Sequence, residues 1–277
     1  MLEFIKRTLY WILRGVPTKK IYASVYQLNT TDRLNGKKVL ITGGGRGLGY
    51  YMAKKLVAEG ASVVISGRDE ETLKNASKSL GNIPYIVYDV QDFANNRNFI
   101  QNADMSLGGG INCLINNAGI SLHEHSFEDV RIEDFDKQFN TNIKAPYFLT
   151  QEFIKYAKEQ HYEGLNVIFI TSERGLYCDT LPYGLTKASI CSLTAGLARK
   201  YVLDNIRVNA IAPGVTASDM TRVDKNGDLY RERACGKRVL LPEEIAEVVS
   251  FVLSNESQCI TGEIFPCNQG NHYRSDY

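Results

Sequence analysis

The sequence lacks the features that mark metal-binding and disulfide-rich proteins. None of its six cysteines forms a Cys-x-x-Cys pair, and among its four histidines only His123 and His125 stand close together. Residues two apart do not face each other on a helix, and no third ligand is evident, so we expect no metal site. In a chain of 277 residues, such cysteines favour free thiols in a reducing compartment such as the cytoplasm over a disulfide framework.

An excess of charge and long apolar runs are also absent. The net charge is +1, with 44% hydrophobic and 23% charged residues. This composition is typical of a globular protein and gives no electrostatic reason to expect a nucleic-acid partner. The apolar run Leu9–Leu13 is too short for a signal peptide, and the segment around it is too short and too charged to span a bilayer.

The start of the chain differs from the rest in charge. Residues 1–35 carry six Lys/Arg against two Asp/Glu, a local charge of +4. Residues 2–16 place apolar side chains on one side of a helix and Arg7 and Arg14 on the other. We therefore interpret 1–35 as an N-terminal amphipathic arm, and favour its docking on this subunit or a neighbouring one. An interfacial membrane anchor and a mobile arm stay open as alternatives.

From Lys37 onward, short apolar runs alternate with helical patterns. The predicted strands are Lys38–Thr42, Ala61–Ile65, Tyr85–Tyr88, Cys113–Ile115, Val167–Ile170, Val208–Ile211 and Glu263–Phe265. The predicted helices include Tyr51–Glu59, a polar helix that ends near Leu80, about Ile132–Gln160, Tyr183–Leu203 and Pro242–Leu253. This alternation predicts an α/β domain over 36–277, with a mostly parallel seven-stranded sheet that helices cover on both faces.

Tyr183 and Lys187 are a candidate proton-transfer pair. Residues four apart share one face of a helix. A phenol titrates near pH ~10, and a nearby cation favours its ionised form. Such a tyrosine can therefore protonate a ketone oxygen, or deprotonate an alcohol, close to neutral pH. The same spacing occurs at Tyr50/Lys54 and Tyr51/Lys55, so the pattern alone does not identify a site.

A glycine-rich turn follows the first strand and opens a helix. Its spacing is Thr42-Gly43-x-x-x-Gly47-x-Gly49. Backbone N–H groups and the helix dipole at such a turn favour a bound phosphate. A structural turn with no ligand is the alternative at this stage.

The end of the second strand bears on which cofactor would bind. About twenty residues past the loop, dinucleotide-binding folds offer an acid to a ribose or an arginine to a 2′-phosphate. Gly67 occupies the expected acid position and Arg68 follows it. Because an arginine can pair with a phosphate, we favour NADP(H) over NAD(H). Asp69 is interpreted as the cap or first turn of the next helix.

With these motifs in order, the chain resembles the classical short-chain dehydrogenase/reductase family over about residues 36–270. The resemblance rests on the glycine loop, Asp89-Val90, Asn116-Asn-Ala-Gly119, Asn142, Ser172, Tyr183/Lys187, and Pro213-Gly214 with Thr216 and Ser218. It implies a Rossmann-type doubly wound fold. It also implies cofactor contacts from Gly43, Gly45, Arg46, Gly47, Leu48, Gly49, Arg68, Asp89, Val90, Asn117, Ala118, Gly119, Tyr183, Lys187, Pro213, Gly214, Thr216 and Ser218.

The resemblance also implies a division of catalytic roles. Hydride from the nicotinamide reaches a carbonyl carbon, and Tyr183 protonates the carbonyl oxygen. Lys187 lowers the pKa of Tyr183 and contacts the nicotinamide ribose. Ser172 donates a hydrogen bond to the substrate oxygen. Asn142 holds a water molecule that links Lys187 to solvent, or bonds only to local backbone.

The chain departs from the family pattern at three places. Ser172 and Tyr183 are 11 positions apart, about two fewer than is common in the family, so the loop between them is short. Thr216 stands where an aliphatic residue is usual, and Ser218 where threonine is usual. Asn268-Gln-Gly270 replaces the common Asp-Gly-Gly. The first departure weakens any transfer of substrate identity, because that loop lines the substrate pocket.

The substrate and partners follow only from the resemblance. The expected lid, about 217–239, carries mixed charges that either attract an anionic substrate or are simply solvated. An apolar ketone such as a steroid is the slight favourite, and a 3-oxoacyl thioester is the alternative. A non-catalytic NADP(H) sensor is a third interpretation, disfavoured because Ser172, Tyr183 and Lys187 are all retained. Family members are dimers or tetramers packed through the helices around 132–160 and 183–203.

Overall fold

The computed structural model describes residues 20–22 and 32–273. The helix predicted over residues 2–16, and most of the N-terminal arm, therefore lie outside the described residues. The described part of residues 1–35 contacts the lid through one short stretch. Leu229 N donates to Ile21 O at 3.0 Å, and Ile21 N donates to the Asp228 carboxylate at 3.2 Å.

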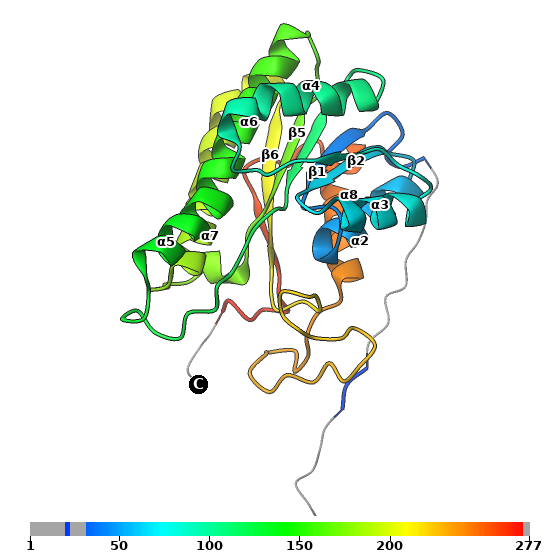
Figure 1. Cartoon of the computed structure of the whole chain (residues 1–277). Coiled ribbons are helices and arrows are strands. Elements are labelled where there is room, and N and C mark those ends of the chain that lie inside the picture. The colour runs from blue at the N-terminus through cyan, green and yellow to red at the C-terminus, as the bar shows by residue number, and fades with distance from the viewer. Residues whose placement is uncertain (1–19, 23–31, 274–277) are drawn as a thin grey trace, which may run out of the picture.

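The seven predicted strands form one parallel sheet in the order β3-β2-β1-β4-β5-β6-β7. Their ends lie within about three residues of the predicted ones. The bounds are β1 Lys38–Thr42, β2 Ser62–Gly67, β3 Tyr85–Val87, β4 Cys113–Asn116, β5 Asn166–Ile170, β6 Arg207–Pro213 and β7 Ile264–Cys267. This order, with helices on both faces, confirms the doubly wound Rossmann-type fold (Figure 1).

Helices cover both faces of the sheet, because alternate residues of each strand point to opposite sides. Val39 and Ile41 pack on the side of α2 (Gly47–Ala58), α3 (Glu70–Ser79) and α8 (Pro242–Leu253). Leu40 packs on the other side, which holds α4 (Asn96–Ser106), α5 (Ile132–Phe139), α6 (Ala145–Glu159) and α7 (Pro182–Tyr201) (Figure 1). Burial of both faces explains why the strands are continuous apolar runs.

The long helix predicted over Ile132–Gln160 is not continuous, and this prediction was wrong in detail. A π-helical turn, Asn140–Lys144, separates α5 from α6. Pro146 at the start of α6 has no N–H, so it cannot donate to the carbonyl of Asn142 four residues earlier. Single π-turns inside α-helices occur frequently at functional sites, and this one contains Asn142.

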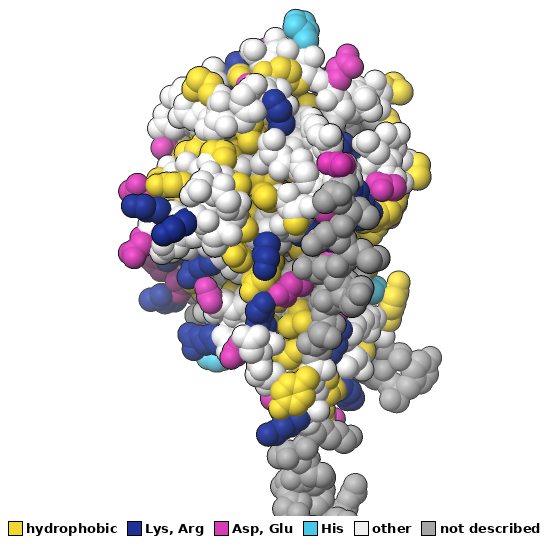
Figure 2. Space-filling view, turned by 90° about the vertical axis from the view of Figure 1, so that its right-hand side faces the viewer, with side chains coloured by type: hydrophobic (Ala, Val, Ile, Leu, Met, Phe, Trp, Pro, Cys, Tyr) yellow, Lys and Arg dark blue, Asp and Glu magenta, His cyan; other side chains and the backbone are white. Residues whose placement is uncertain are grey.

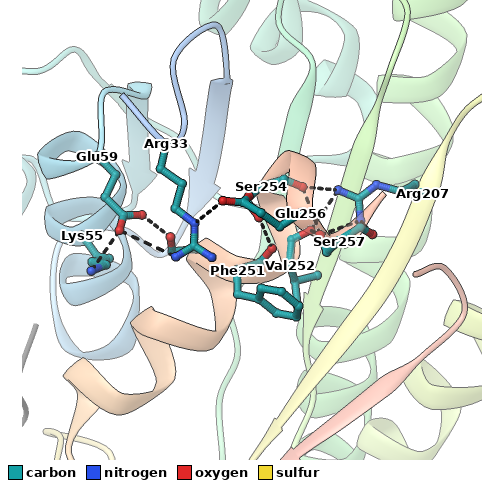
Figure 3. A network of polar contacts seen from close by, with 10 residues as sticks. Arg33, Lys55, Glu59, Arg207, Phe251, Val252, Ser254, Glu256 and Ser257 are labelled. Carbon is teal, nitrogen blue, oxygen red and sulfur yellow. Dashed lines mark hydrogen bonds and ion pairs between the residues drawn. The ribbon is translucent and has the colours of Figure 1, made fainter. Parts of the chain in front are cut away.

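A network of charged groups around the buried side chains of Lys55 and Glu59 joins α2 to α8, on the side of the sheet away from α7. Lys55 Nζ lies 3.0 Å from Glu59 and 2.8 Å from Glu247. Arg33 lies between Glu59 and Glu256 (Figure 3). These contacts connect the chain before β1, helix α2 and helix α8 into one body.

The segment expected to be a lid, 217–239, is irregular and lies beyond the carboxyl ends of the strands (Figure 1). It has its own small apolar core of Ala217, Leu229, Val239 and Leu241. Lys/Arg and Asp/Glu side chains are interspersed on the face drawn in Figure 2. None of the helices in residues 20–22 and 32–273 is long and apolar enough to cross a membrane.

Candidate active site

The glycine loop has the backbone that its sequence predicts. Gly43 has a φ of +65°, a conformation that other residues rarely adopt. A Cβ atom at Gly49 would lie 2.1 Å from Gly43 O, so only glycine fits there. The N-terminus of α2 has no side-chain cap from Arg46. Its first N–H groups are thus left for an anion.

The end of β4 is bound to this loop. Asn117 Nδ2 donates to Thr42 O and Gly43 O, both at 2.9 Å. The Thr42 hydroxyl oxygen accepts from the N–H groups of Asn117 and Ala118, both at 3.1 Å. The structure therefore brings the predicted contacts 43–49 and 117–118 together where β1 and β4 lie side by side. That is the point at which the strand order reverses, where ligands of open α/β sheets bind.

The adenosine end of the predicted cofactor site is open and carries cations. Arg46 and Arg68 are both exposed, and Arg46 lies 3.6 Å from Asp219 on the lid. Asp69 caps α3, since its carboxylate accepts from Thr72 N at 2.7 Å, which confirms its predicted place. The Asp89 carboxylate accepts a hydrogen bond from Gln91 N at 2.9 Å within its own loop, which also contains Val90.

Ser172, Tyr183 and Lys187 meet where β5 leads into α7. Ser172 follows β5, and Tyr183 is the second residue of α7 after Pro182. Lys187 Nζ lies 5.6 Å from the centre of the Tyr183 ring and donates to Ile170 O at 2.9 Å. The Ser172 hydroxyl lies near enough to Tyr183 to lower the pKa of its phenol by hydrogen bonding. The predicted trio therefore converges on one small volume.

Burial changes how these groups titrate. It raises the pKa of the Tyr183 phenol, whereas the hydrogen bond with Ser172 and the charge of Arg174 lower it. Burial lowers the pKa of Lys187 to about 8. Titratable groups with perturbed pKa values that gather at one place are a mark of functional sites.

Asn142 is held by backbone and by α7. Its side-chain oxygen accepts from Ile120 N at 2.9 Å, and its Nδ2 donates to Ile120 O at 2.8 Å and to Thr186 at 3.3 Å. A Cβ atom at Gly119 would lie 3.4 Å from Asn142 Oδ1 and 3.5 Å from Lys187 Nζ. Asn142 and Lys187 thus lie close to the same glycine, so Asn142 belongs to the site through its position.

The segment after β6 explains one departure from the family pattern. Thr216 is buried, and its hydroxyl donates to Gly214 O at 2.9 Å. A hydrogen-bonded hydroxyl can be buried at little cost, so threonine replaces an aliphatic residue here without penalty. Ser218 contacts Thr221 through their hydroxyl groups at 3.3 Å. Pro213 ends β6 at the same edge of the sheet as the glycine loop.

Glu173 and Arg174 follow Ser172 in the loop that the sequence places at the substrate pocket, but their contacts were not predicted. Glu173 is buried next to Ser172 and accepts from Asn271 Nδ2 at 2.9 Å. Arg174 forms a two-point ion pair with Asp179. An acid directly after Ser172 is visible in the sequence, but its partner Asn271 lies 98 residues away. The Arg174–Asp179 spacing could have been noticed inside such a short loop.

The remaining positions singled out from sequence are His123, His125, Tyr50 and Tyr51. His123 and His125 are both exposed. No group of three or more His, Cys, Asp or Glu side chains that could hold a metal occurs among the described residues. Tyr50 contacts Ser79 at 3.1 Å, and the Tyr51 ring faces Lys225. Both tyrosines line a pocket together with Gly45, Arg46 and Gly47 of the glycine loop.

Comparison with known proteins agrees with this arrangement. The family model described as Enoyl-(Acyl carrier protein) reductase matches residues 43–272. The chain belongs to the short-chain dehydrogenase/reductase family.

Similar proteins include reductases and cofactor complexes of that family. The chain is 34% identical to the 3-oxoacyl-[acyl-carrier-protein] reductase FabG of Rickettsia felis, over 86% of this chain and 97% of that protein. A short chain dehydrogenase from Burkholderia cenocepacia, solved with NADP, matches with a TM-score of 0.77 at 29% identity, covering 86% and 99% of the two chains. The 3-ketoacyl-(acyl-carrier-protein) reductase from Brucella melitensis, solved with NADH, matches with a TM-score of 0.78 at 27% identity, over 86% and 99%. As a member of this family, the chain is an oxidoreductase that acts on CH–OH groups.

Proposed function

We propose that this chain reduces 3-oxoacyl thioesters with NADPH. One feature of the structure carries the chemistry: the hydroxyl groups of Ser172 and Tyr183 lie together beside Lys187. Two hydroxyl donors at one point can share a single substrate oxygen. They stabilise the negative charge that forms on that oxygen when a carbonyl is reduced.

The substrate class differs from the slight favourite of the sequence analysis. Several of the most similar proteins are named 3-oxoacyl-[acyl-carrier-protein] reductases. Their names support the alternative over an apolar ketone such as a steroid. On the lid, Arg222, Arg231 and Arg233 are exposed, whereas Lys225 and Arg238 are paired with Glu243 and Glu244. Exposed arginines suit an anionic acyl carrier.

The residues around the glycine loop fit the proposed cofactor. Arg46 and Arg68 supply cations for a 2′-phosphate, and no acid stands at Gly67. NAD(H) is the alternative cofactor. When bound, the dihydronicotinamide supplies the hydride. Gly43, Gly45, Gly47, Leu48, Gly49, Asp89, Val90, Asn117, Ala118, Gly119, Pro213, Gly214, Thr216 and Ser218 complete the proposed cofactor contacts.

We assign the following roles to the chain's own residues. Tyr183 donates its phenolic proton to the substrate oxygen, and Ser172 donates a hydrogen bond to the same atom. Lys187 stabilises the Tyr183 phenolate that remains and holds the nicotinamide ribose. Asn142 fixes the water through which the proton is replaced. The same steps in reverse oxidise the alcohol.

We also propose that the protein acts as a homo-oligomer. Large apolar side chains are exposed together on α5, α6 and α7. They are Ile132, Phe135, Tyr147, Phe148 and Leu185. An apolar surface of this kind is typical of an interface between subunits, which gives a dimer or, with a second interface, a tetramer. Its unpaired cysteines favour the cytoplasm as its location.

The function is tested by NADPH consumption with four probes. They are the 3-oxobutanoyl and 2-butenoyl thioesters of N-acetylcysteamine, a 3-ketosteroid and a small diketone. The proposal predicts turnover of the 3-oxobutanoyl thioester and a far lower kcat/KM with the others. A preference for the 2-butenoyl thioester would replace it with enoyl reduction, which the description of the family model names. Tight NADPH binding without turnover of any probe would favour the sensor.

A fluorescence titration tests the cofactor assignment separately. NADPH should bind more tightly than NADH to the wild type. The Arg68→Ala variant should lose affinity for NADPH only, because the lost contact is to the 2′-phosphate. Equal or tighter binding of NADH to the wild type would contradict the assignment.

A further inference from the structure

The short segment between Ser172 and Tyr183 contains an ion pair that the roles above do not use. Arg174 Nε donates to Asp179 Oδ2 at 2.5 Å, and Nη2 donates to Oδ1 at 2.6 Å. Two parallel bonds fix the plane of a guanidinium as well as its position. Arg174 is also held from the other side, because its backbone N–H donates to Ser172 Oγ at 3.3 Å.

Asp179 is fixed against the first turn of α7. Its Oδ1 also accepts from Leu181 N at 3.0 Å. A Cβ atom at Gly184 would lie 2.0 Å from Asp179 Oδ2, so the carboxylate occupies space that any other residue at 184 would fill. The pair therefore closes the shortened loop directly beside Tyr183.

This geometry places two cations next to the Tyr183 ring. The guanidinium carbon of Arg174 lies 5.8 Å from the ring centre, and Lys187 Nζ lies 5.6 Å from it. The pKa values of the two cations are shifted in opposite directions. Burial lowers the pKa of Lys187 to about 8. Burial also acts to lower the pKa of Arg174, but the hydrogen bonds and charge of Asp179 outweigh it and raise that pKa.

We propose that Arg174 is a positioning residue that holds a permanent positive charge beside Tyr183, and that the negative charge of Asp179 sets how strongly Arg174 acts on Tyr183. The phenolate left after proton transfer is then stabilised by Arg174 as well as by Lys187. This inference rests on the proposed role of Tyr183 as the proton donor, but on no particular substrate.

Few other titratable groups of the described chain influence Tyr183. Tyr177, in the same loop, raises the pKa of Tyr183 when it ionises, whereas Arg174 lowers it. Glu173 points to Asn271 instead. Among residues 32–273, no charged group on another element that packs against α7 is a further cause of the shift in the pKa of Tyr183.

Three variants separate an electrostatic role from a purely structural one. Arg174→Gln removes the positive charge. Arg174→Lys keeps the charge but loses the two-point geometry. Asp179→Asn removes the opposing negative charge, and its side-chain oxygen can still accept from Leu181 N. Thermal unfolding of each variant shows whether the loop still folds.

The first readout is the pH dependence of kcat for oxidation of the 3-hydroxybutanoyl thioester with NADP⁺. Oxidation needs the Tyr183 phenolate, so the acid limb of the profile follows its ionisation. Arg174→Gln should move that limb to higher pH by about one half to one unit. Asp179→Asn should move it to lower pH, and Arg174→Lys should stay near the wild type. If the ion pair has only a structural role, Arg174→Gln and Asp179→Asn should both lower kcat. The acid limb of the pH profile should then not move in opposite directions in the two variants.

The second readout needs no substrate. Ultraviolet absorbance of tyrosinate is titrated with NADP⁺ bound, for each variant and for the same variant carrying Tyr183→Phe, and the difference reports Tyr183 alone. If the thioester is not a substrate, turnover fails but these shifts remain. If Tyr183 titrates at one pH in wild type, Arg174→Gln and Asp179→Asn, the role of Arg174 is overturned whatever the substrate.

Discussion

Helices α2 and α7 carry the same Tyr-x-x-x-Lys spacing, but the two lysines are buried in opposite electrostatic surroundings. Lys55 on α2 has carboxylates of Glu59, labelled in Figure 3, and of Glu247 within about 3 Å. No ion pair of Lys187 on α7 is found in the part of the chain that the structure describes, and its Nζ donates to the carbonyl of Ile170. Two nearby carboxylates neutralise a lysine, so only Lys187 has charge left for a neighbouring phenol or a ligand.

The two tyrosines differ in the same way. The Tyr51 ring of α2 faces Lys225 of the segment 217–239 at 4.5 Å. The Ser172 hydroxyl lies near enough to Tyr183, at the carboxyl edge of the sheet, to lower its pKa by hydrogen bonding. We therefore expect this spacing to be functional only where the fold supplies a neighbouring hydroxyl and leaves the lysine without a counter-ion.

The largest expected effect separates the two tyrosines. Tyr183→Phe should lower kcat for the 3-oxobutanoyl thioester by about 10²–10⁴-fold, because the proton donor is lost. Tyr51→Phe makes the same chemical change on α2 and should leave kcat within error of the wild type. NADPH consumption under saturating substrate measures both. Similar losses in the two variants would remove the distinction drawn between the helices.

Next in size is the effect on folding at Lys55. Lys55→Met leaves the buried Glu59 carboxylate without its closest cation, which should cost about 3–5 kcal/mol of unfolding free energy. The neighbouring Lys54 is exposed, so Lys54→Met is a matched control and should change stability by less than about 0.5 kcal/mol. Urea unfolding followed by circular dichroism compares them. Equal stability of both variants would show that the network contributes nothing.

Lys187→Met should raise stability, whereas Lys55→Met should lower it, and the size of the increase should depend on pH. Burial lowers the pKa of Lys187 to about 8 from the ordinary 10.5, so between these pH values the unfolded chain binds more protons and stability rises with pH. At pH 7 the buried charge thus costs about 3 kcal/mol. The stability of Lys187→Met relative to wild type should be highest near pH 7 and fall by that amount towards pH 10.5. A difference independent of pH would contradict the shifted pKa.

The smallest expected effect concerns Gly67, the last residue of β2. A Cβ atom at Gly67 would meet only Leu73, at 3.5 Å, so Gly67→Asp fits sterically. Its carboxylate would repel a 2′-phosphate and accept from a ribose hydroxyl, which should shift the NADPH/NADH affinity ratio about tenfold towards NADH. Fluorescence titration measures it, with Gly67→Ala as the uncharged control. An unchanged ratio in Gly67→Asp would place the adenosine ribose elsewhere.

Much of the fold was predictable because its signals are local. Strands of a parallel sheet are buried on both faces and appear as apolar runs. The glycine loop needs a positive φ at Gly43 and no side chain at Gly49, and both requirements are visible as glycines. Asp69 was likewise predicted from its place before a helix.

The parts that were not predicted depend on geometry or on distant contacts. The π-turn at Asn142 follows from how Pro146 is accommodated inside a helix, and no periodicity distinguishes it from a continuous helix. The Glu173–Asn271 bond joins positions far apart in the chain. The same holds for the Lys55 network, because Glu247 lies on a helix near the other end of the sequence.

The central claim is hydride transfer to a carbonyl at the Ser172–Tyr183–Lys187 site, and isotope transfer tests it most directly. The wild type is incubated with NADPH deuterated at C4 of the nicotinamide and the 3-oxobutanoyl thioester, and the product is examined by mass spectrometry and NMR. The account predicts a 3-hydroxybutanoyl thioester with deuterium on C3, and no such product from Tyr183→Phe. A product without deuterium on C3, or equal labelling by both proteins, would contradict it.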